Sequence, residues 1–357
     1  MEFCIGTAGN AANLDIVKVS EDLGFSHHGL ADGPLLFSDP FVLLGIAARE
    51  TTTINVGTLV VNPLTRIPAV LANAMATLNQ VAPGRVFFGI GAANNAVRSM
   101  GVPIARLAET EDAIRQFKGL MAGERVPNSW RGETKDIQFL THPDHGWLNV
   151  KDHIPVWQAA GGPKSIKSAA KYADAIIYPT GSDPALVALV RRLIDEAAAA
   201  HGRDGAQIKL VGSAFFALRK KGDTVEDAMR GGFGNGPVIT GDTNIRLIRQ
   251  YPGEFDERIA DFAEAAVKAY TPQEGADESL DHLDIFRAHA NGVIDSRHIA
   301  ITTEFAANSL CLWGDYETIA ERVAGMRDAG CDIPLAQLVN PVNYRRDMED
   351  LAKAIYG

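Results

Sequence analysis

Short apolar runs and amphipathic helices alternate eight times along the chain, and this alternation restricts the fold more than any other feature. A strand followed each time by a helix indicates parallel pairing with right-handed crossovers. Eight such units usually close into a ring, so we predict an α/β fold, a (β/α)8 TIM barrel. An open, doubly wound sheet is the structural alternative. The expected strands are 2–9, 26–32, 53–61, 85–91, 154–162, 174–181, 207–220 and 333–341.

Two stretches interrupt the alternation and are predicted to be insertions at the barrel mouth. Residues 124–153, after the fourth strand, are polar and rich in turns, and residues 222–310, after the seventh, are long and mixed. Residues 1–357 are therefore predicted to form a single domain with two lengthened connections. The second insertion fits a lid over a substrate pocket or an oligomer interface equally well.

The helix signals are specific enough to test. Asp39 and Pro40 are typical of a cap and first-turn pair at the start of the second helix. The helix at about 66–81 is expected to bury one stripe, made of Ile67, Val70, Leu71, Ala74, Leu78 and Val81.

Composition and charge exclude several classes of function. The formal net charge of −10 argues against a nucleic-acid partner, which requires basic patches. No apolar run reaches the roughly 20 residues that cross a bilayer, and the first residues do not resemble a secretory signal. The three cysteines are too scattered for a disulfide framework or a thiolate zinc site, which favours a cytoplasmic protein.

Ligands of such a barrel bind at the carboxyl ends of its strands, where this chain carries mostly glycine and alanine. At 160–164, two glycines end a strand and Pro163 begins a helix, which leaves backbone amides free to bind phosphate. The turn at 181–182 is expected to lie beside it. Together the two turns favour a phosphorylated cofactor, although each is also compatible with an ordinary tight turn. The Gly-x-Gly at 89–91 lacks the third glycine of a dinucleotide fingerprint.

The histidines give weaker signals. His28 and Asp32 lie on one face of the second strand, and the pair could transfer a proton, but a buried structural histidine is an equal alternative. His142, His145 and His153 lack a metal-site spacing, as do His282, His289 and His298, so no metal site is expected. No nucleophile elbow is present, which gives hydrolase chemistry little support.

Three segments carry a resemblance to a known family. Residues 24–101, 154–181 and 309–332 resemble the luciferase-like monooxygenase superfamily, and are most similar to its methylenetetrahydromethanopterin reductase-like branch. The order of "GTLVVNPLTRIPA" and "APGRVFFGIG" is rather specific to that superfamily. The likeness is weakest over 124–150 and 222–300.

The resemblance implies a TIM barrel that holds FMN or the deazaflavin coenzyme F420 at its mouth. It also implies a non-prolyl cis peptide bond at Leu59–Val60, against the flavin-type ring, with Asn62 near the ring edge. The turns expected to hold the ring, the ribityl chain and the phosphate comprise Gly91, Ala92, Asn94, Ala160, Gly161, Gly162, Lys164, Gly181 and Ser182. Many relatives have an Asp-His pair after the second strand, whereas here Gly33 follows Asp32. We therefore expect Asp32, with His28 as a substitute for the missing histidine, to be catalytic.

By this resemblance we predict a flavin-type oxidoreductase, with F420-dependent hydride transfer to or from a small organic substrate as the main hypothesis. The alternatives are an FMN-dependent monooxygenase, a cofactor-free binding or assembly barrel, and a phosphate-binding aldolase or isomerase. Apolar side chains suggest a moderately apolar substrate, and relatives are often homodimers. Those side chains are Leu35, Leu36, Phe37 and Trp313.

Overall fold

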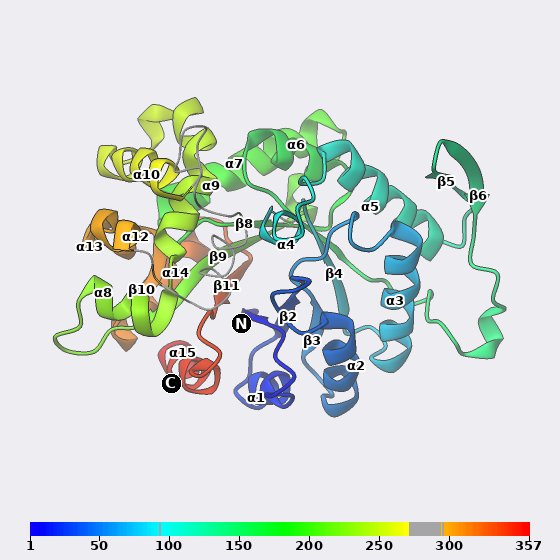
Figure 1. Cartoon of the computed structure of the whole chain (residues 1–357), viewed down its shortest axis with the longest axis horizontal. Helices are drawn as coiled ribbons and strands as arrows, with labels where there is room; N and C mark the ends of the chain where they lie inside the picture. Colours follow the sequence, from blue (N-terminus) through cyan, green and yellow to red (C-terminus); the bar gives the residue numbers. More distant parts are fainter. Residues whose placement is uncertain (93, 271–293, 295) are drawn as a thin grey trace.

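The computed structural model describes residues 1–92, 94–270, 294 and 296–357. Within these ranges, eight parallel strands close into a ring because the last pairs with the first. The predicted TIM barrel is therefore confirmed (Figure 1). In order around the ring the strands are β1 (Cys4–Ala8), β2 (His27–Ala31), β3 (Asn55–Thr58), β4 (Val86–Ile90), β7 (Val156–Ala159), β8 (Ala175–Tyr178), β9 (Lys209–Leu218) and β11 (Ile333–Gln337).

Helices cover the outside of the ring. Asp39 caps α2 as expected, since its carboxylate accepts hydrogen bonds from the amides of Phe41 and Val42. The stripe expected on α3 is partly wrong, because Val70 and Val81 are about half exposed. The helices around the ring are α1 (Ile16–Asp22), α2 (Pro40–Glu50), α3 (Pro68–Val81), α4 (Asn94–Arg98), α5 (Leu107–Met121), α6 (Pro163–Tyr172), α7 (Pro184–Ala200), α14 (Tyr316–Asp328) and α15 (Tyr344–Tyr356).

The segment 124–153 contains an antiparallel hairpin, β5 (Val126–Trp130) and β6 (Glu133–Ile137), which stands away from the barrel (Figure 1). Because the segment joins the end of α5 to the start of β7, it lies toward the amino-terminal ends of the ring strands, and its predicted place at the mouth is wrong. Sequence periodicity did not predict these strands, because four of the five β6 residues are exposed and show no apolar alternation. The turn η1 (Pro143–His145) follows the hairpin.

Most of the described part of 222–310 is helical, and 271–293 and 295 lie outside the described residues. Its elements are α8 (Val225–Ala228), the π-helical turn η3 (Met229–Phe233), α9 (Gly236–Gln250), η4 (Pro252–Glu254), α10 (Glu257–Tyr270), α12 (Ser296–Ile301) and α13 (Glu304–Leu310). A strand that the sequence did not predict, β10 (Cys311–Gly314), follows directly. It pairs with 215–218 of β9, which extends beyond the end of β8.

Apolar side chains on the ring strands and their covering helices form two separate layers. One cluster contains only strand residues and fills the barrel interior, whereas the largest cluster joins the outward faces of the strands to the helices. On β2 the alternation is clear. The His27 ring lies 5.1 Å from the ring of Trp157 in the interior, and Leu30 belongs to the outer cluster. Inward and outward positions can therefore be assigned along every strand.

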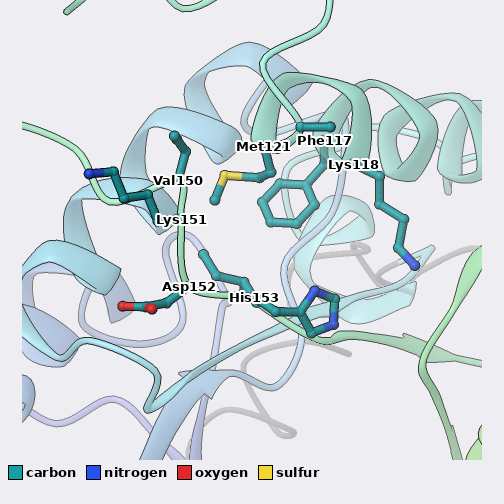
Figure 2. A pocket seen from close by; sticks show the side chains of 9 residues that line it. Phe117, Lys118, Met121, Val150, Lys151, Asp152 and His153 are labelled. Carbon is teal, nitrogen blue, oxygen red and sulfur yellow. The ribbon is translucent and has the colours of Figure 1, made fainter. Parts of the chain in front are cut away.

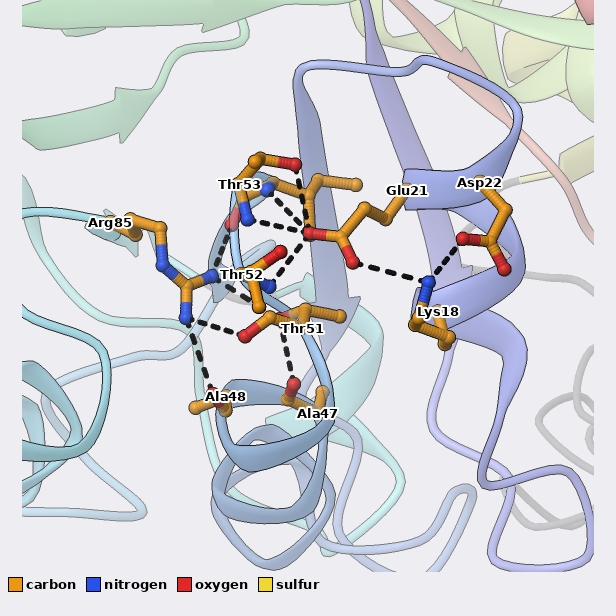
Figure 3. A network of polar contacts seen from close by, with 10 residues as sticks. Lys18, Glu21, Asp22, Ala47, Ala48, Thr51, Thr52, Thr53 and Arg85 are labelled. Carbon is orange, nitrogen blue, oxygen red and sulfur yellow. Dashed lines mark hydrogen bonds and ion pairs between the residues drawn. The ribbon is translucent and has the colours of Figure 1, made fainter.

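A polar network ties α1 and α2 to the loop that enters β3, at the amino-terminal ends of the strands (Figure 3). Oε1 of Glu21 accepts hydrogen bonds from the amides of Thr52, Thr53 and Ile54 at 2.6–3.1 Å. Arg85 donates to carbonyls at the carboxyl end of α2 and in the same loop. These contacts satisfy backbone groups that α2 leaves unpaired where it ends.

Candidate functional site

The carboxyl ends of the strands form a mouth lined by small side chains. Five ring strands end in a partly exposed residue that follows buried ones, and on four of them this residue is Ala8, Ala31, Ala159 or Gln337. Each of these positions faces inward by the alternation of its strand. Solvent therefore reaches the inner wall of the barrel at this end, where ligands of TIM barrels bind.

The peptide bond between Leu59 and Val60 is cis, as expected. It lies between two neighbouring strands, since the amide of Leu59 donates to Leu30 of β2 and the amide of Val61 donates to Gly89 of β4. Both Leu59 and Val60 have partly buried side chains that pack against the interior cluster. The two side chains thus form part of the accessible floor of the mouth.

Glycines on the adjacent strands make room for these two side chains. A Cβ at Gly29 would lie 2.6 Å from Leu59 Cβ, and a Cβ at Gly91 would lie 3.1 Å from Val60 Cγ2. Real Cβ atoms do not approach that closely without a shift of the neighbour. The Gly-x-Gly at 89–91 is therefore explained by packing: a Cβ at Gly89 would lie 1.9 Å from the carbonyl oxygen of Thr58, and a Cβ at Gly91 would meet Ala159 and Val60.

Asn62 is fully buried, and its side chain is used in a local turn. Oδ1 accepts from the amides of Leu64 at 3.0 Å and Thr65 at 2.9 Å, and Nδ2 donates to the hydroxyl of Thr65. Such a turn positions the backbone. A ring-edge role for Asn62 stays a prediction.

The turn after β4 places Ala92, which is half-exposed, one residue beyond Gly91. The carbonyl of Ala92 accepts from the amide of Ala105, and Asn94 begins α4. The backbone of this turn thus lies next to Val60, where a ring-binding role was predicted.

The turn between β7 and α6 combines small residues with a lysine side chain. Ala160 is buried and donates its amide to the carbonyl of Ile177, and Gly161 donates its amide to Ser165 Oγ at 3.0 Å, so these two amides are not free as predicted. Gly162 occupies the cap position of α6, and Lys164 is exposed in its first turn.

Helix α9 contributes a basic side chain that sequence reasoning missed. A Cβ at Gly162 would lie 3.9 Å from Arg246 Cβ, and Arg246 is exposed. Within the described ranges, neither Arg246 nor Lys164 forms an ion pair. Two cations at a helix amino terminus favour an anion there.

The neighbouring turn at Gly181 and Ser182 does not offer free amides, which corrects the prediction of a second anion-binding turn. Gly181 donates to the carbonyl of Ser213, and Ser182 donates to that of Ser309. The Ser182 hydroxyl bonds Cys311 O at 2.7 Å. Gly181 is needed because a Cβ would lie 2.6 Å from Leu310 Cα. This turn is a packing contact with the segment that leads into β10.

His28 lies on the helix-facing side of β2, and this placement speaks against its predicted role in proton transfer. Its side chain is fully buried, with Nε2 2.9 Å from Thr7 Oγ1. Burial lowers the pKa of His28 to about 3, so the ring stays neutral. Among the described residues, no hydrogen bond or ion pair joins His28 to Asp32. His28 is best explained as a structural histidine.

Asp32 follows β2 directly and is nearly buried, with 2% of its side chain exposed. Burial raises the pKa of Asp32, the positive charge of Arg66 opposes that rise, and the negative charge of Asp39 adds to it. Of the two residues predicted to be catalytic, Asp32 therefore remains a candidate, at the carboxyl end of β2.

Other predicted features lie elsewhere. Trp313 is fully buried beside Phe233 and under Arg219, so it does not line the mouth. Leu35 is 85% exposed, in a positive-φ turn. No cluster of metal-binding side chains occurs in the described part of the chain, and His282 and His289 lie outside it. Its helices include none that combines the length and apolarity needed to cross a bilayer.

A separate pocket of about 310 Å³ lies between α5 and the segment before β7 (Figure 2). Phe117, Met121 and Ile154 form its apolar wall, and Lys118 and His153 lie at its edge. Because it precedes β7, this pocket lies toward the amino-terminal ends of the strands. It is not part of the candidate site.

Comparisons with known proteins identify similar sequences and a similar fold. The chain is 27% identical over 205 residues to a 5,10-methylenetetrahydromethanopterin reductase of Methanolobus tindarius, covering 57% of this chain and 60% of that protein. It is 33% identical over 174 residues to an F420-dependent glucose-6-phosphate dehydrogenase of Kineococcus radiotolerans, covering 47% and 49%. The chain thus spans between about half and three fifths of these relatives.

A solved structure with the same fold is the coenzyme F420-dependent tetrahydromethanopterin reductase of Methanopyrus kandleri. Its TM-score is 0.70 at 20% identity, covering 99% of this chain and 98% of that one. The family described as luciferase-like monooxygenase matches residues 5–332. The chain therefore belongs to the luciferase-like monooxygenase family.

Proposed function

We propose that the protein is an F420-dependent oxidoreductase that transfers a hydride to or from a small organic substrate. The observation that carries this proposal is the accessible mouth of small residues, flanked on one side by Lys164 and Arg246, which form no ion pair with any described residue. The similarity to enzymes named as F420-dependent supports it. The bound coenzyme would supply the two-electron redox chemistry.

The residues at the mouth fit a planar group with an anionic tail. Leu59 and Val60 offer partly exposed apolar surface for a ring, and Gly91 and Ala92 let it approach the backbone closely. Gly161 and its neighbours would hold the phosphate together with the two cations. The role of this chain is then to bind, orient and exclude water.

Asp32 is our candidate for proton transfer to or from the substrate. It is an ionisable group at the end of β2, and its environment shifts its pKa upward, toward the range useful for general acid–base work. A conservative test is Asp32→Asn, which keeps the shape and removes the charge.

Turnover assays distinguish the candidate functions. Purified protein is mixed with F420 and a panel of secondary alcohols and sugar phosphates, and the loss of coenzyme absorbance is followed. In parallel, reduced FMN is supplied and substrate-dependent oxygen incorporation is measured by mass spectrometry. We expect coenzyme reduction in the first assay. Oxygenation in the second assay alone would favour the FMN monooxygenase, and activity in neither assay would favour a cofactor-free barrel.

We also propose a homodimer without nucleic-acid partners, located in the cytoplasm. Trp130, Leu140 and Trp147 on and after the hairpin are 57%, 96% and 67% exposed, which supports a protein contact there. The three cysteines are buried and free, as a reducing compartment allows. Sedimentation equilibrium tests the dimer, and a monomer mass at micromolar concentration would contradict it.

A further inference from the structure

An incompletely paired carboxylate and guanidinium face each other at the mouth. Nε of Arg66, in the loop after β3, lies 3.9 Å from Oδ2 of Asp32, too far for a hydrogen bond. Both atoms are buried, and neither has a hydrogen-bond partner in the described residues. The separation still permits a strong charge interaction, because nearly all of the Asp32 side chain is removed from water.

The guanidinium of Arg66 is held from two other directions. One nitrogen donates to Oδ2 of Asp39, whose other oxygen caps α2 through the amide of Phe41 at 2.9 Å. The Arg66 guanidinium carbon also lies 4.9 Å from the centre of the Phe41 ring. The capped end of α2 therefore fixes where the positive charge sits relative to Asp32.

We propose that Arg66, anchored by Asp39 and Phe41, is a positioning residue that keeps the Asp32 carboxylate ionised at the barrel mouth. The inference rests on the proposed function for its catalytic consequence, since Asp32 accepts the substrate proton only while it is ionised. The effect of Arg66 on the charge of Asp32 does not depend on the proposed function, because it involves only residues of this chain. The charged groups that act on Asp32, among the described residues, are Arg66 and Asp39.

The direct test is the titration of Asp32 in the protein without cofactor. The side-chain carboxyl carbons of aspartate are labelled with carbon-13, and the Asp32 signal is assigned by its loss in Asp32→Asn. We expect Arg66→Met to raise the pKa of Asp32 by about one unit or more, the range for losing a cation within 4–6 Å. Arg66→Lys keeps the positive charge but loses the planar guanidinium that binds Asp39. The pKa of Asp32 should therefore rise less in Arg66→Lys than in Arg66→Met.

Arg115→Met is the matched control, because it also removes an arginine paired with a carboxylate, at the exposed surface of α5. It should leave the Asp32 titration unchanged. An unchanged Asp32 pKa in folded Arg66→Met, or equal shifts in Arg66→Met and Arg66→Lys, would overturn the proposal. Circular dichroism verifies folding, and Arg66→Lys provides a second variant should Arg66→Met not fold.

The pH dependence of turnover gives a second measurement, which should not change if Arg66 had only a structural role. With an active substrate, the limb of the kcat/KM–pH profile assigned to Asp32 should shift upward in Arg66→Met by the same amount as in the titration. Should F420 support no turnover at all, the proposed function fails, while the titration still decides whether Arg66 controls the charge of Asp32.

Discussion

Replacing Glu21 by Gln tests how the barrel is held together at the end opposite the mouth. Burial alone would raise the pKa of Glu21, but hydrogen bonds from the amides of Thr53, Thr52 and Ile54 lower it to about 2 (Figure 3). Gln has the shape of protonated Glu and lacks its charge. The substitution therefore removes the charge-assisted part of these bonds.

The magnitude follows from the pKa shift. A pKa lowered from 4.5 to about 2 corresponds to roughly 3 kcal/mol of stabilisation in full. Thr52 and Thr53 are exposed, so water can replace part of the hydrogen bonding that their amides lose. We therefore expect Glu21→Gln to lower the free energy of unfolding by about 2 kcal/mol at pH 7. For a chain of this length, this corresponds to a fall in Tm of about 3 °C.

The contribution of Glu21 to stability should depend on pH. Because the folded-state pKa is depressed, the contribution is fully present above about pH 4.5 and is lost as the pH falls toward 2. Urea unfolding of wild type and Glu21→Gln should therefore converge over that interval. Glu50→Gln, at the exposed end of α2, is the control and should change little. Equal stability of Glu21→Gln and wild type at pH 7 would refute the reasoning.

Three further outcomes are expected. Gly161→Leu should weaken F420 binding at least tenfold in a fluorescence titration with little change in Tm, because its Cβ would lie near only Thr243. Arg246→Ala should raise the Kd for F420 about fivefold at low salt, and exposed Lys167→Ala should not. Gly181→Ala should lower the free energy of unfolding by more than 2 kcal/mol, because φ is +60° and the new Cβ would clash with the backbone of Leu310. Gly123→Ala, at φ +77° with open space around it, should cost about 1 kcal/mol.

The barrel was predictable because its signals are local. Each strand and its helix show their periodicity within about 20 residues, and caps such as Asp39 mark where helices begin. Local patterns fail where packing decides. In α3 the buried face includes Met75 and Asn79 and leaves out Val70. This face is determined by the packing of α3 against β4, α2 and α5.

The site was only partly predictable, because contacts between distant segments decide which groups are free. The turn at Gly181 has the composition of an anion site, yet its two amides donate to the carbonyls of Ser213 and Ser309, and Leu310 fills the space beside Gly181. Conversely, no local motif marks Arg246 or Arg66, whose positions depend on how α9 and the capped end of α2 pack.

The most direct measurement of the central claim is the dissociation constant of F420 for the purified protein, from coenzyme fluorescence, with FMN as competitor. We predict saturable, micromolar or tighter binding of F420 at one site per chain, with FMN at least tenfold weaker. Tight binding of FMN with weak binding of F420 would contradict the cofactor assignment. Binding of neither would contradict a cofactor site at the mouth altogether.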